Sequence, residues 1–185
     1  GKQKAMGEAI TERDSLPVMT TLGVTTLISD SGVTRYRVNT EEWMMYDRKK
    51  PSYWAFEKGV YMEQFDSIFN VEASIKADTA YYYDKERLWK LIGNVDIQNR
   101  KGERFNTELL YWNEATQKVY SDKFIRIQQP DRIITGHGFD SNQQMTIYTI
   151  RNIEGIFYVD EEASSGPPQP ETKALPDSVN KDTAK

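Results

Sequence analysis

"WKLIGNVDIQNRKGERFNTELLYW" (residues 89–112) decides the fold, because two runs of alternating residues flank one polar turn. In the first run, apolar or small residues occupy every second position, with Lys90, Asn94 and Asp96 among the residues between them. Alternation with a period of two is typical of a strand that buries one face. The stretch therefore predicts a β-hairpin whose solvated turn is Arg100–Glu103. Its apolar set is Trp89, Leu91, Gly93, Val95 and Ile97.

The same pattern recurs along the chain. "VEASIKA" (71–77) alternates strictly, and the stretches 124–128 and 145–150 continue the habit. Polar turn signals separate the runs at Asp30–Gly32, Asn113–Thr116 and Asp140–Asn142. Short alternating runs with regular turn signals predict an all-β sandwich or partial barrel built as a meander.

Composition excludes several classes of protein. The chain has 185 residues, a length typical of one domain, and a net charge of -4 gives no basic surface for nucleic acid. With no cysteine, it has no disulfide, no thiol nucleophile and no cysteine-ligated metal. No run of apolar residues reaches the roughly 18 that a membrane span needs.

The two ends differ from the middle. Residues 1–16 are polar and begin with Gly1 instead of Met, so we expect a linker that follows a removed signal or membrane anchor. Residues 161–185 hold four of the seven prolines and no aromatic residue, which predicts a disordered tail. The folded domain is predicted to span 17–160.

A weak internal repeat suggests stacked hairpins. Residues 80–98 and 109–128 share an aromatic pair, a polar turn, a strand, a small polar break and a second strand. Residues 43–64 form a looser third copy. Such a period is compatible with hairpins that cover one another's apolar faces, although a simple meander can imitate it.

Residues that could carry catalysis are few. His137 is the only histidine, lies between two glycines and is interpreted as a turn residue, because no second histidine or serine nucleophile motif accompanies it. The carboxylates fall mostly on polar faces or turns, where solvated surface is the simplest interpretation. We therefore predict no enzyme activity, no metal and no cofactor. The carboxylates considered as a glycosidase-type pair were Asp78, Asp84, Asp96 and Glu108.

The aromatic residues allow two interpretations. Tryptophans and Phe56 on alternating strands are ordinarily core, but they could also line an apolar groove that is open to a lipid. A meander that does not close would in addition leave two edge strands available for pairing with another protein. The tryptophans are Trp43, Trp54, Trp89 and Trp112.

The order of these landmarks resembles the LptC family, the periplasmic component of lipopolysaccharide export, over about residues 22–158. Within this order, the run from Lys76 to Asp78 followed by Gly93 and Val95 is similar to the core motif of the family. The remaining segments that carry the resemblance are "SDSGVTRYRV" (29–38), "YWAFEKGVYMEQFD" (53–66), "IKADTAYYYDKERLWKLIGNVDI" (75–97), "TELLYWNEATQKVYSD" (107–122) and "GHGFDSN" (136–142).

The resemblance implies an open, twisted antiparallel β-jellyroll that binds lipopolysaccharide and has no reaction of its own. It implies a periplasmic location, with an N-terminal anchor in the inner membrane that is either a membrane span or a lipidated cysteine. The implied partners are subunits of the ABC transporter (LptF/LptG-like) and an LptA-like jellyroll joined by edge-strand pairing. Gly32 and Gly138 match glycines linked to assembly or transport, although both could simply permit turns. Strand parity gives the expected groove lining as Tyr36, Val38, Trp54, Phe56, Val60, Val71, Ala73, Ile75, Leu91, Val95, Ile125, Ile127 and Ile147.

Two rival functions remain open from the sequence. In a carbohydrate-binding or adhesive β-sandwich, the aromatic residues would form an exposed flat platform. A hydrolase would instead require acidic residues gathered in a cleft. The direction in which Trp54 and Phe56 point separates the lipid hypothesis from the carbohydrate one.

Overall fold

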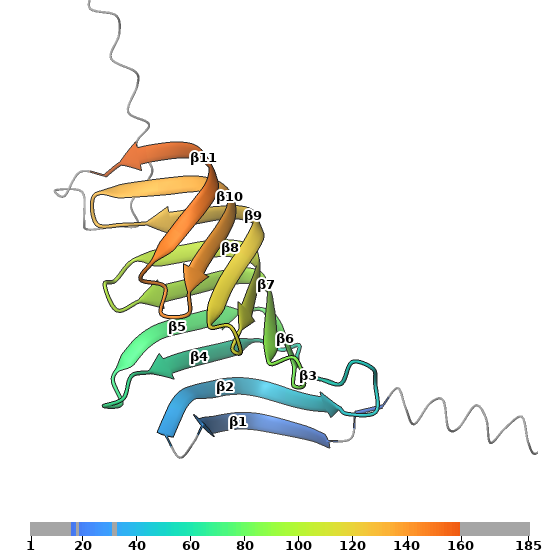
Figure 1. Cartoon of the computed structure of the whole chain (residues 1–185). Helices are drawn as coiled ribbons and strands as arrows, with labels where there is room; N and C mark the ends of the chain where they lie inside the picture. The colour runs from blue at the N-terminus through green and yellow to red at the C-terminus, as the bar shows by residue number, and fades with distance from the viewer. Residues whose placement is uncertain (1–15, 18, 31–32, 160–185) are drawn as a thin grey trace, which may run out of the picture.

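The computed structural model describes residues 16–17, 19–30 and 33–159, and these form one antiparallel sheet of eleven strands. The predicted all-β, jellyroll-like class is confirmed (Figure 1). Over the described ranges, no helix has the length and hydropathy to cross a membrane. The strands are β1 (Met19–Asp30), β2 (Val33–Tyr46), β3 (Tyr53–Phe56), β4 (Val60–Phe65), β5 (Val71–Ala77), β6 (Thr79–Tyr83), β7 (Leu88–Asn99), β8 (Arg104–Asn113), β9 (Lys118–Gln128), β10 (Arg132–Asn142) and β11 (Tyr148–Tyr158).

The stretch 89–112 forms the β7–β8 hairpin, as predicted. Trp89 lies opposite Trp112, Ile97 lies opposite Phe105, and residues 100–103 connect the strands. All four of these side chains are buried, and Trp89 is fully so. The alternating pattern has therefore placed one complete face of the hairpin in the core.

Strand pairing folds the sheet back on itself. β7 pairs with β8 on one edge, while on its other edge Leu88–Ile92 pairs with β6 and Asp96–Asn99 pairs with β5. In the same way, one half of β2 pairs with β3 and the other half pairs with β4. β3 in turn pairs with β6, and β4 pairs with β5. These pairings close a ring of six strands, so two layers face each other between β2 and β7.

Local breaks in register bend the long strands where the layers diverge. The β7–β8 register shifts between Ile92 and Val95, around Gly93 and Asn94, which have φ angles of 83° and 45°. A β-carbon on Gly93 would meet the Asp78 carboxylate at 2.9 Å. Bulges bend strands and increase their twist, and Figure 1 shows β7 to β11 curving through both layers.

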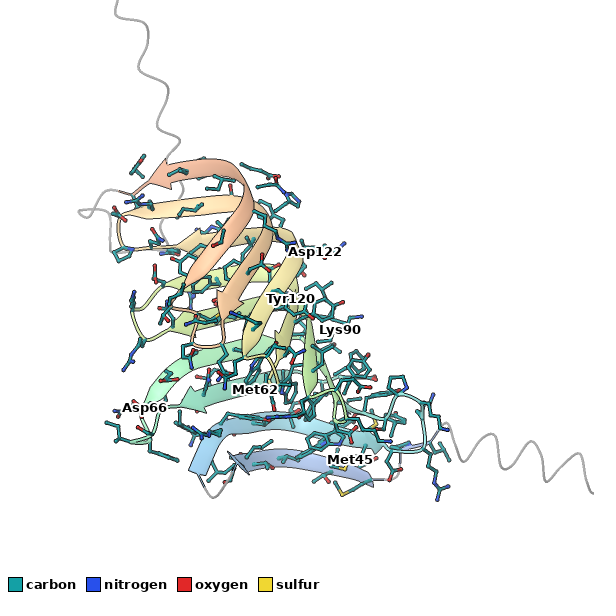
Figure 2. The ribbon with its side chains drawn as sticks, in the orientation of Figure 1. Met45, Met62, Asp66, Lys90, Tyr120 and Asp122 are labelled. Atoms are coloured by element: carbon teal, nitrogen blue, oxygen red, sulfur yellow. The ribbon has the colours of Figure 1, made fainter. Side chains whose placement is uncertain are left out.

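Aromatic rings fill the space between the layers around Trp89. Its ring lies 4.6 Å from Tyr82 and 5.4 Å from Phe56, measured between centroids, and 6.3 Å from Trp112. These residues come from β3, β6, β7 and β8, so the cluster joins both layers. Outward-facing side chains such as Lys90 and Tyr120 lie on the opposite face (Figure 2).

The first two copies of the sequence repeat form successive hairpins, β6–β7 and β8–β9. Arg87 and Gln117 occupy equivalent places at the ends of their turns, with φ angles of 54° and 56°. The third stretch, 43–64, spans the end of β2 and two short strands, so it does not repeat this hairpin.

Two local predictions were wrong. His137 lies within β10, and its ring forms a hydrogen bond with the side chain of Glu154 in β11. It is therefore not a turn residue. Asp140–Asn142 also belongs to β10, and the turn follows it at 143–147 because the Asn142 side chain accepts backbone hydrogen bonds from Thr146 and Ile147. The predicted N-terminal linker and Pro-rich tail lie almost entirely outside the described residues.

Replacing Trp89 with alanine should lower the free energy of unfolding by about 3–5 kcal/mol, the usual cost of truncating a buried large aromatic residue. The change removes the center of the aromatic cluster and one hydrogen bond to Glu114. Urea denaturation followed by circular dichroism measures the loss. Glu86→Ala, at an exposed turn position next to the same strand, is the control and should change stability by less than about 0.5 kcal/mol.

Candidate functional site

The inner faces of the two layers form the candidate site. Of the thirteen side chains predicted to line a groove, Trp54 is partly buried and ten are buried. Inward orientation therefore agrees with strand parity for these eleven, whereas a role in binding lipid stays a prediction. The ten buried residues are Tyr36, Val38, Phe56, Val60, Ala73, Ile75, Leu91, Val95, Ile125 and Ile127.

For the other two, the predicted inward orientation was wrong. Val71 is 46% exposed, because the β4–β5 register shifts between Gln64 and Phe65 and one extra β5 residue interrupts the alternation. Ile147 is 76% exposed and lies in the turn organised by Asn142, outside any strand. In both cases a local backbone irregularity changed the parity that the sequence pattern had implied.

The structure describes only one of the two glycines that were expected to matter for assembly or transport. Gly32 lies outside the described residues. Gly138 lies in β10 at a register shift between His137 and Phe139, with a φ angle of 83°. A β-carbon there would approach the Arg151 side chain to 2.8 Å. Gly138 thus has a structural reason to be glycine, in a bulge instead of a turn.

Buried side chains fill the C-terminal half of the interior. Phe105, Phe139 and Met145 are fully buried there. The Tyr148 hydroxyl donates to Glu103 at 2.7 Å, and the Asn99 side chain donates to the Met145 carbonyl at 2.9 Å. These bonds join the turn after β7 to the turn before β11, so the opposite ends of the strands meet over the core.

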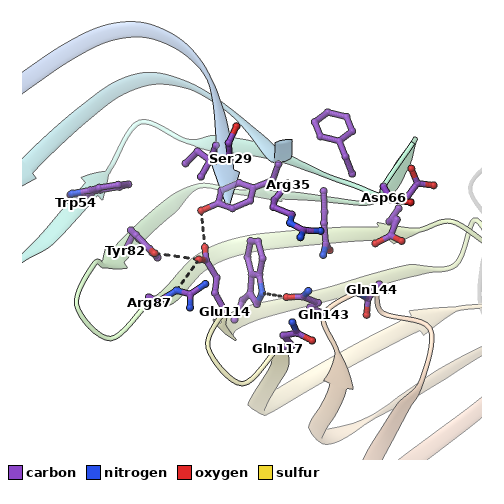
Figure 3. Close-up of a pocket in the computed structure, with 17 residues that line it drawn as sticks. Ser29, Arg35, Trp54, Asp66, Tyr82, Arg87, Glu114, Gln117, Gln143 and Gln144 are labelled. Carbon is purple, nitrogen blue, oxygen red and sulfur yellow. Dashed lines mark hydrogen bonds and ion pairs between the residues drawn. The ribbon is translucent and has the colours of Figure 1, made fainter. Parts of the chain in front are cut away.

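The N-terminal half is open and contains a cavity of about 510 Å³. Figure 3 shows how residues of several turns surround it, with Trp54 and Tyr82 at one end and Asp66 at the other. Of the predicted lining residues, only Tyr36 and Trp54 border this cavity. The complete lining is Ile28, Ser29, Arg35, Tyr36, Trp54, Gln64, Phe65, Asp66, Ser67, Glu72, Tyr82, Arg87, Trp112, Glu114, Gln117, Gln143 and Gln144.

Glu114 is the polar center of this region. Its carboxylate accepts hydrogen bonds from the Tyr36 hydroxyl at 2.7 Å, the indole N–H of Trp89 at 2.8 Å and the Tyr82 hydroxyl at 3.3 Å. Burial and the neighbouring Glu114 carboxylate raise the pKa of both Tyr36 and Tyr82 above the ordinary tyrosine value. One carboxylate therefore fixes three aromatic side chains from β2, β6 and β7.

Sequence reasoning missed the polar residues of the cavity. Arg87, Glu114, Gln117 and Gln143 belong to hairpin turns, where solvent exposure is the ordinary expectation. The signal that could have identified the first three was the repeat, because it placed two chemically similar turns at the same end of adjacent hairpins.

The side chains named for the two rival functions lie in different places. The four tryptophans are buried or partly buried and lie inside, so they do not form an exposed platform. The Asp84 carboxylate accepts a hydrogen bond from Ser52 at 2.7 Å, whereas Asp78, Asp96 and Glu108 border a hollow on the outer face. Among the described residues, no group of three or more acidic or histidine side chains could hold a metal ion.

Both ends of the sheet are open. Among the residues that the structure describes, β1 pairs only with β2, and β11 pairs only with β10. Leu22 and Leu27 are exposed on β1, as are Ile153 and Ile156 on β11. Within the described part of the chain, two long edge strands thus lie at opposite ends of the sheet, each with a strand partner on one side.

A family model described as "Lipopolysaccharide-assembly, LptC-related" matches residues 15–156, which include nearly all of the sheet. The chain belongs to the LptC family. It is therefore assigned to lipopolysaccharide transport as a component of the machinery, in a family that is non-enzymatic, periplasmic and associated with the inner membrane. A comparison with curated proteins gave no match.

Tyr148 of this LptC family member should ionise at an unusually high pH. Burial and the hydrogen bond to Glu103 raise the pKa of Tyr148 to about 12. Because the folded pKa exceeds that of the unfolded chain, the stabilisation is complete below about pH 10 and is lost as the pH rises towards 12. Tyrosinate absorbance measured against pH should show Tyr148 ionising well above the ordinary tyrosine pKa. Tyr148→Phe is the control, and an unchanged titration curve would contradict the assignment.

Proposed function

We propose that this protein is a lipopolysaccharide-binding bridge, which holds acyl chains of the lipid between its two layers and passes the lipid on. The observation that carries the proposal is an apolar interior that opens, at one end, into a cavity of about 510 Å³. That volume falls within the range of sites for small molecules and lipids.

Energetics favour acyl chains as the buried part of the ligand. Burial of each methylene group contributes about 0.8 kcal/mol, so a few carbons from each chain give substantial affinity. Phosphates and sugars would remain at the mouth, because burying an unpaired polar group costs several kcal/mol. Trp54 and Tyr36, which border the cavity, are the residues we expect an entering chain to meet first.

The two open edges support a position between two partners. We propose that the β11 edge pairs with an LptA-like jellyroll, and that the β1 edge faces the LptF/LptG-like subunits of the inner-membrane ABC transporter. Addition of a strand uses backbone hydrogen bonds that an edge already presents. The proposal includes an N-terminal membrane anchor and assigns ATP hydrolysis to another subunit.

A photo-crosslinking residue placed at Trp54 or Phe56 should form adducts with lipopolysaccharide in irradiated cells. Both side chains point into the interior, and Trp54 borders the cavity. Immunoblotting against lipopolysaccharide detects the adducts. Lys90, on the outer face, is the matched control. Equal labelling at Lys90, or no adduct at either inner position, would exclude the proposed path.

Lysine at both Ile153 and Ile156 should prevent the β11 edge from pairing with an LptA-like partner, because added charges hinder strand addition. Both side chains are exposed, so the unfolding midpoint should change little. Binding is measured with the purified partner by biolayer interferometry. Leu22→Lys with Leu27→Lys is the control at the β1 edge and should leave this interaction intact. If that control abolished binding and the β11 variant did not, the assignment of edges would be reversed.

A further inference from the structure

The indole N–H of Trp43 is a buried donor without an acceptor. Trp43 is 8% exposed, and among the described residues no acceptor lies within hydrogen-bond distance of its ring nitrogen. The other buried side-chain atom without a hydrogen bond is Oδ1 of Asp96, which forms an ion pair with Arg104 at 3.2 Å. Within the described part of the chain, Trp43 therefore carries the one buried polar side-chain group that lacks any partner.

The other buried tryptophans do have acceptors. Trp89 donates to Glu114 at 2.8 Å, and Trp112 donates to Gln143 at 3.3 Å. Nearly all buried polar groups in proteins are paired, and a buried donor left without an acceptor destabilises the fold. Phenylalanine in place of Trp43 would fill apolar space without this cost. Packing therefore accounts for an aromatic ring at this position and does not account for its N–H.

Trp43 lies close to the cavity described above. Its ring centroid is 4.9 Å from that of Trp54 and 5.5 Å from that of Phe56. Trp54 borders the cavity and Trp43 does not, so Trp43 lies one ring away from it. We expect a chain that passes Trp54 on its way into the interior to come within reach of the unpaired donor.

The surroundings limit the kind of acceptor that can bind there. An indole N–H only donates, so its partner must supply a lone pair. The rings of Trp54 and Phe56 are uncharged, and a phosphate or carboxylate buried against them without a cation would be strongly destabilised. The acceptor that fits is a neutral oxygen attached to hydrocarbon, such as the carbonyl of an ester or amide, or a hydroxyl on the chain. An acyl chain carries such an oxygen, whereas a plain alkyl chain does not.

We propose that Trp43 determines specificity in the interior, because its indole N–H donates a hydrogen bond to a neutral oxygen on an acyl chain of the ligand. This inference rests on the proposed function and adds a preference to it, for acylated lipids over amphiphiles of equal chain length that lack this oxygen. The unpaired donor destabilises the free protein, and the bound acyl chain removes that penalty.

Trp43→Phe removes the donor and keeps an aromatic ring. Binding is measured by isothermal titration calorimetry with three probes: lipopolysaccharide, sucrose monolaurate and dodecyl maltoside. The last two both join a disaccharide to a chain of equal length, but only sucrose monolaurate has an acyl carbonyl. We expect binding of lipopolysaccharide and sucrose monolaurate to weaken about three- to tenfold, the effect of one net hydrogen bond, and binding of dodecyl maltoside to change less than about twofold.

Benzothienylalanine in place of Trp43 keeps both fused rings and removes only the N–H, so it separates the hydrogen bond from packing. It should give the same loss for the two acylated probes, even if the phenylalanine variant does not fold. In the ligand-free protein it should leave the unfolding midpoint unchanged or higher. The same replacement of Trp89 is the matched control and should lower the midpoint, because Glu114 then loses a donor.

The N–H group itself gives a second readout. In a proton–nitrogen NMR correlation spectrum, the Trp43 indole peak is the one that Trp43→Phe removes. Sucrose monolaurate should shift its proton downfield, because a new hydrogen bond forms, whereas dodecyl maltoside should not.

The outcomes separate this inference from the proposed function. If the unmodified protein binds lipopolysaccharide and neither replacement of Trp43 changes the affinity for any probe, the inference is overturned and the lipid bridge stands. Equal weakening for all three probes, or an indole peak that sucrose monolaurate does not shift, also overturns the inference, because Trp43 then contributes packing alone. If the unmodified protein binds none of the three probes, both are overturned.

Discussion

The structure depends on one constraint: a single edge of a long strand pairs with two different strands. β7 pairs with β6 along one half and with β5 along the other, and β2 divides in the same way. A single sheet that obeys both pairings must fold into two facing layers. The enclosed interior, the bends near Gly93 and Gly138, and the opposed rows of turns all follow from this arrangement.

The interior is consequently not uniform along the stack of strands. Where β7 to β11 lie together, Phe105, Phe139 and Met145 fill the space, and hydrogen bonds from Tyr148 and Asn99 tie the ends of the strands together. Nearer β1 and β2, the layers are separated by a cavity, and Glu114 organises the aromatic side chains beside it. A ligand that enters at the open end meets polar turns before it meets the apolar interior.

Sequence alternation predicted much of this, because a strand with one buried face leaves a period of two in its residues. It placed Leu91, Val95 and Ile127 correctly in the interior. It failed at Val71 and Ile147, where a bulge and an asparagine-stabilised turn change parity without leaving a pattern in hydropathy. Glu114 was missed for another reason, since a carboxylate in a hairpin turn is ordinarily exposed to solvent, and its three aromatic partners come from separate strands.

The open edges at opposite ends of the stack have a consequence for assembly. An interface between two different edges is heterologous, and repeated use of such an interface generates open filaments unless rotation closes a ring. A protein built this way can be added to a linear series of jellyrolls without changing its fold. In the proposed bridge, the residues along the two edges would have to favour the two different partners over a second copy of the same chain.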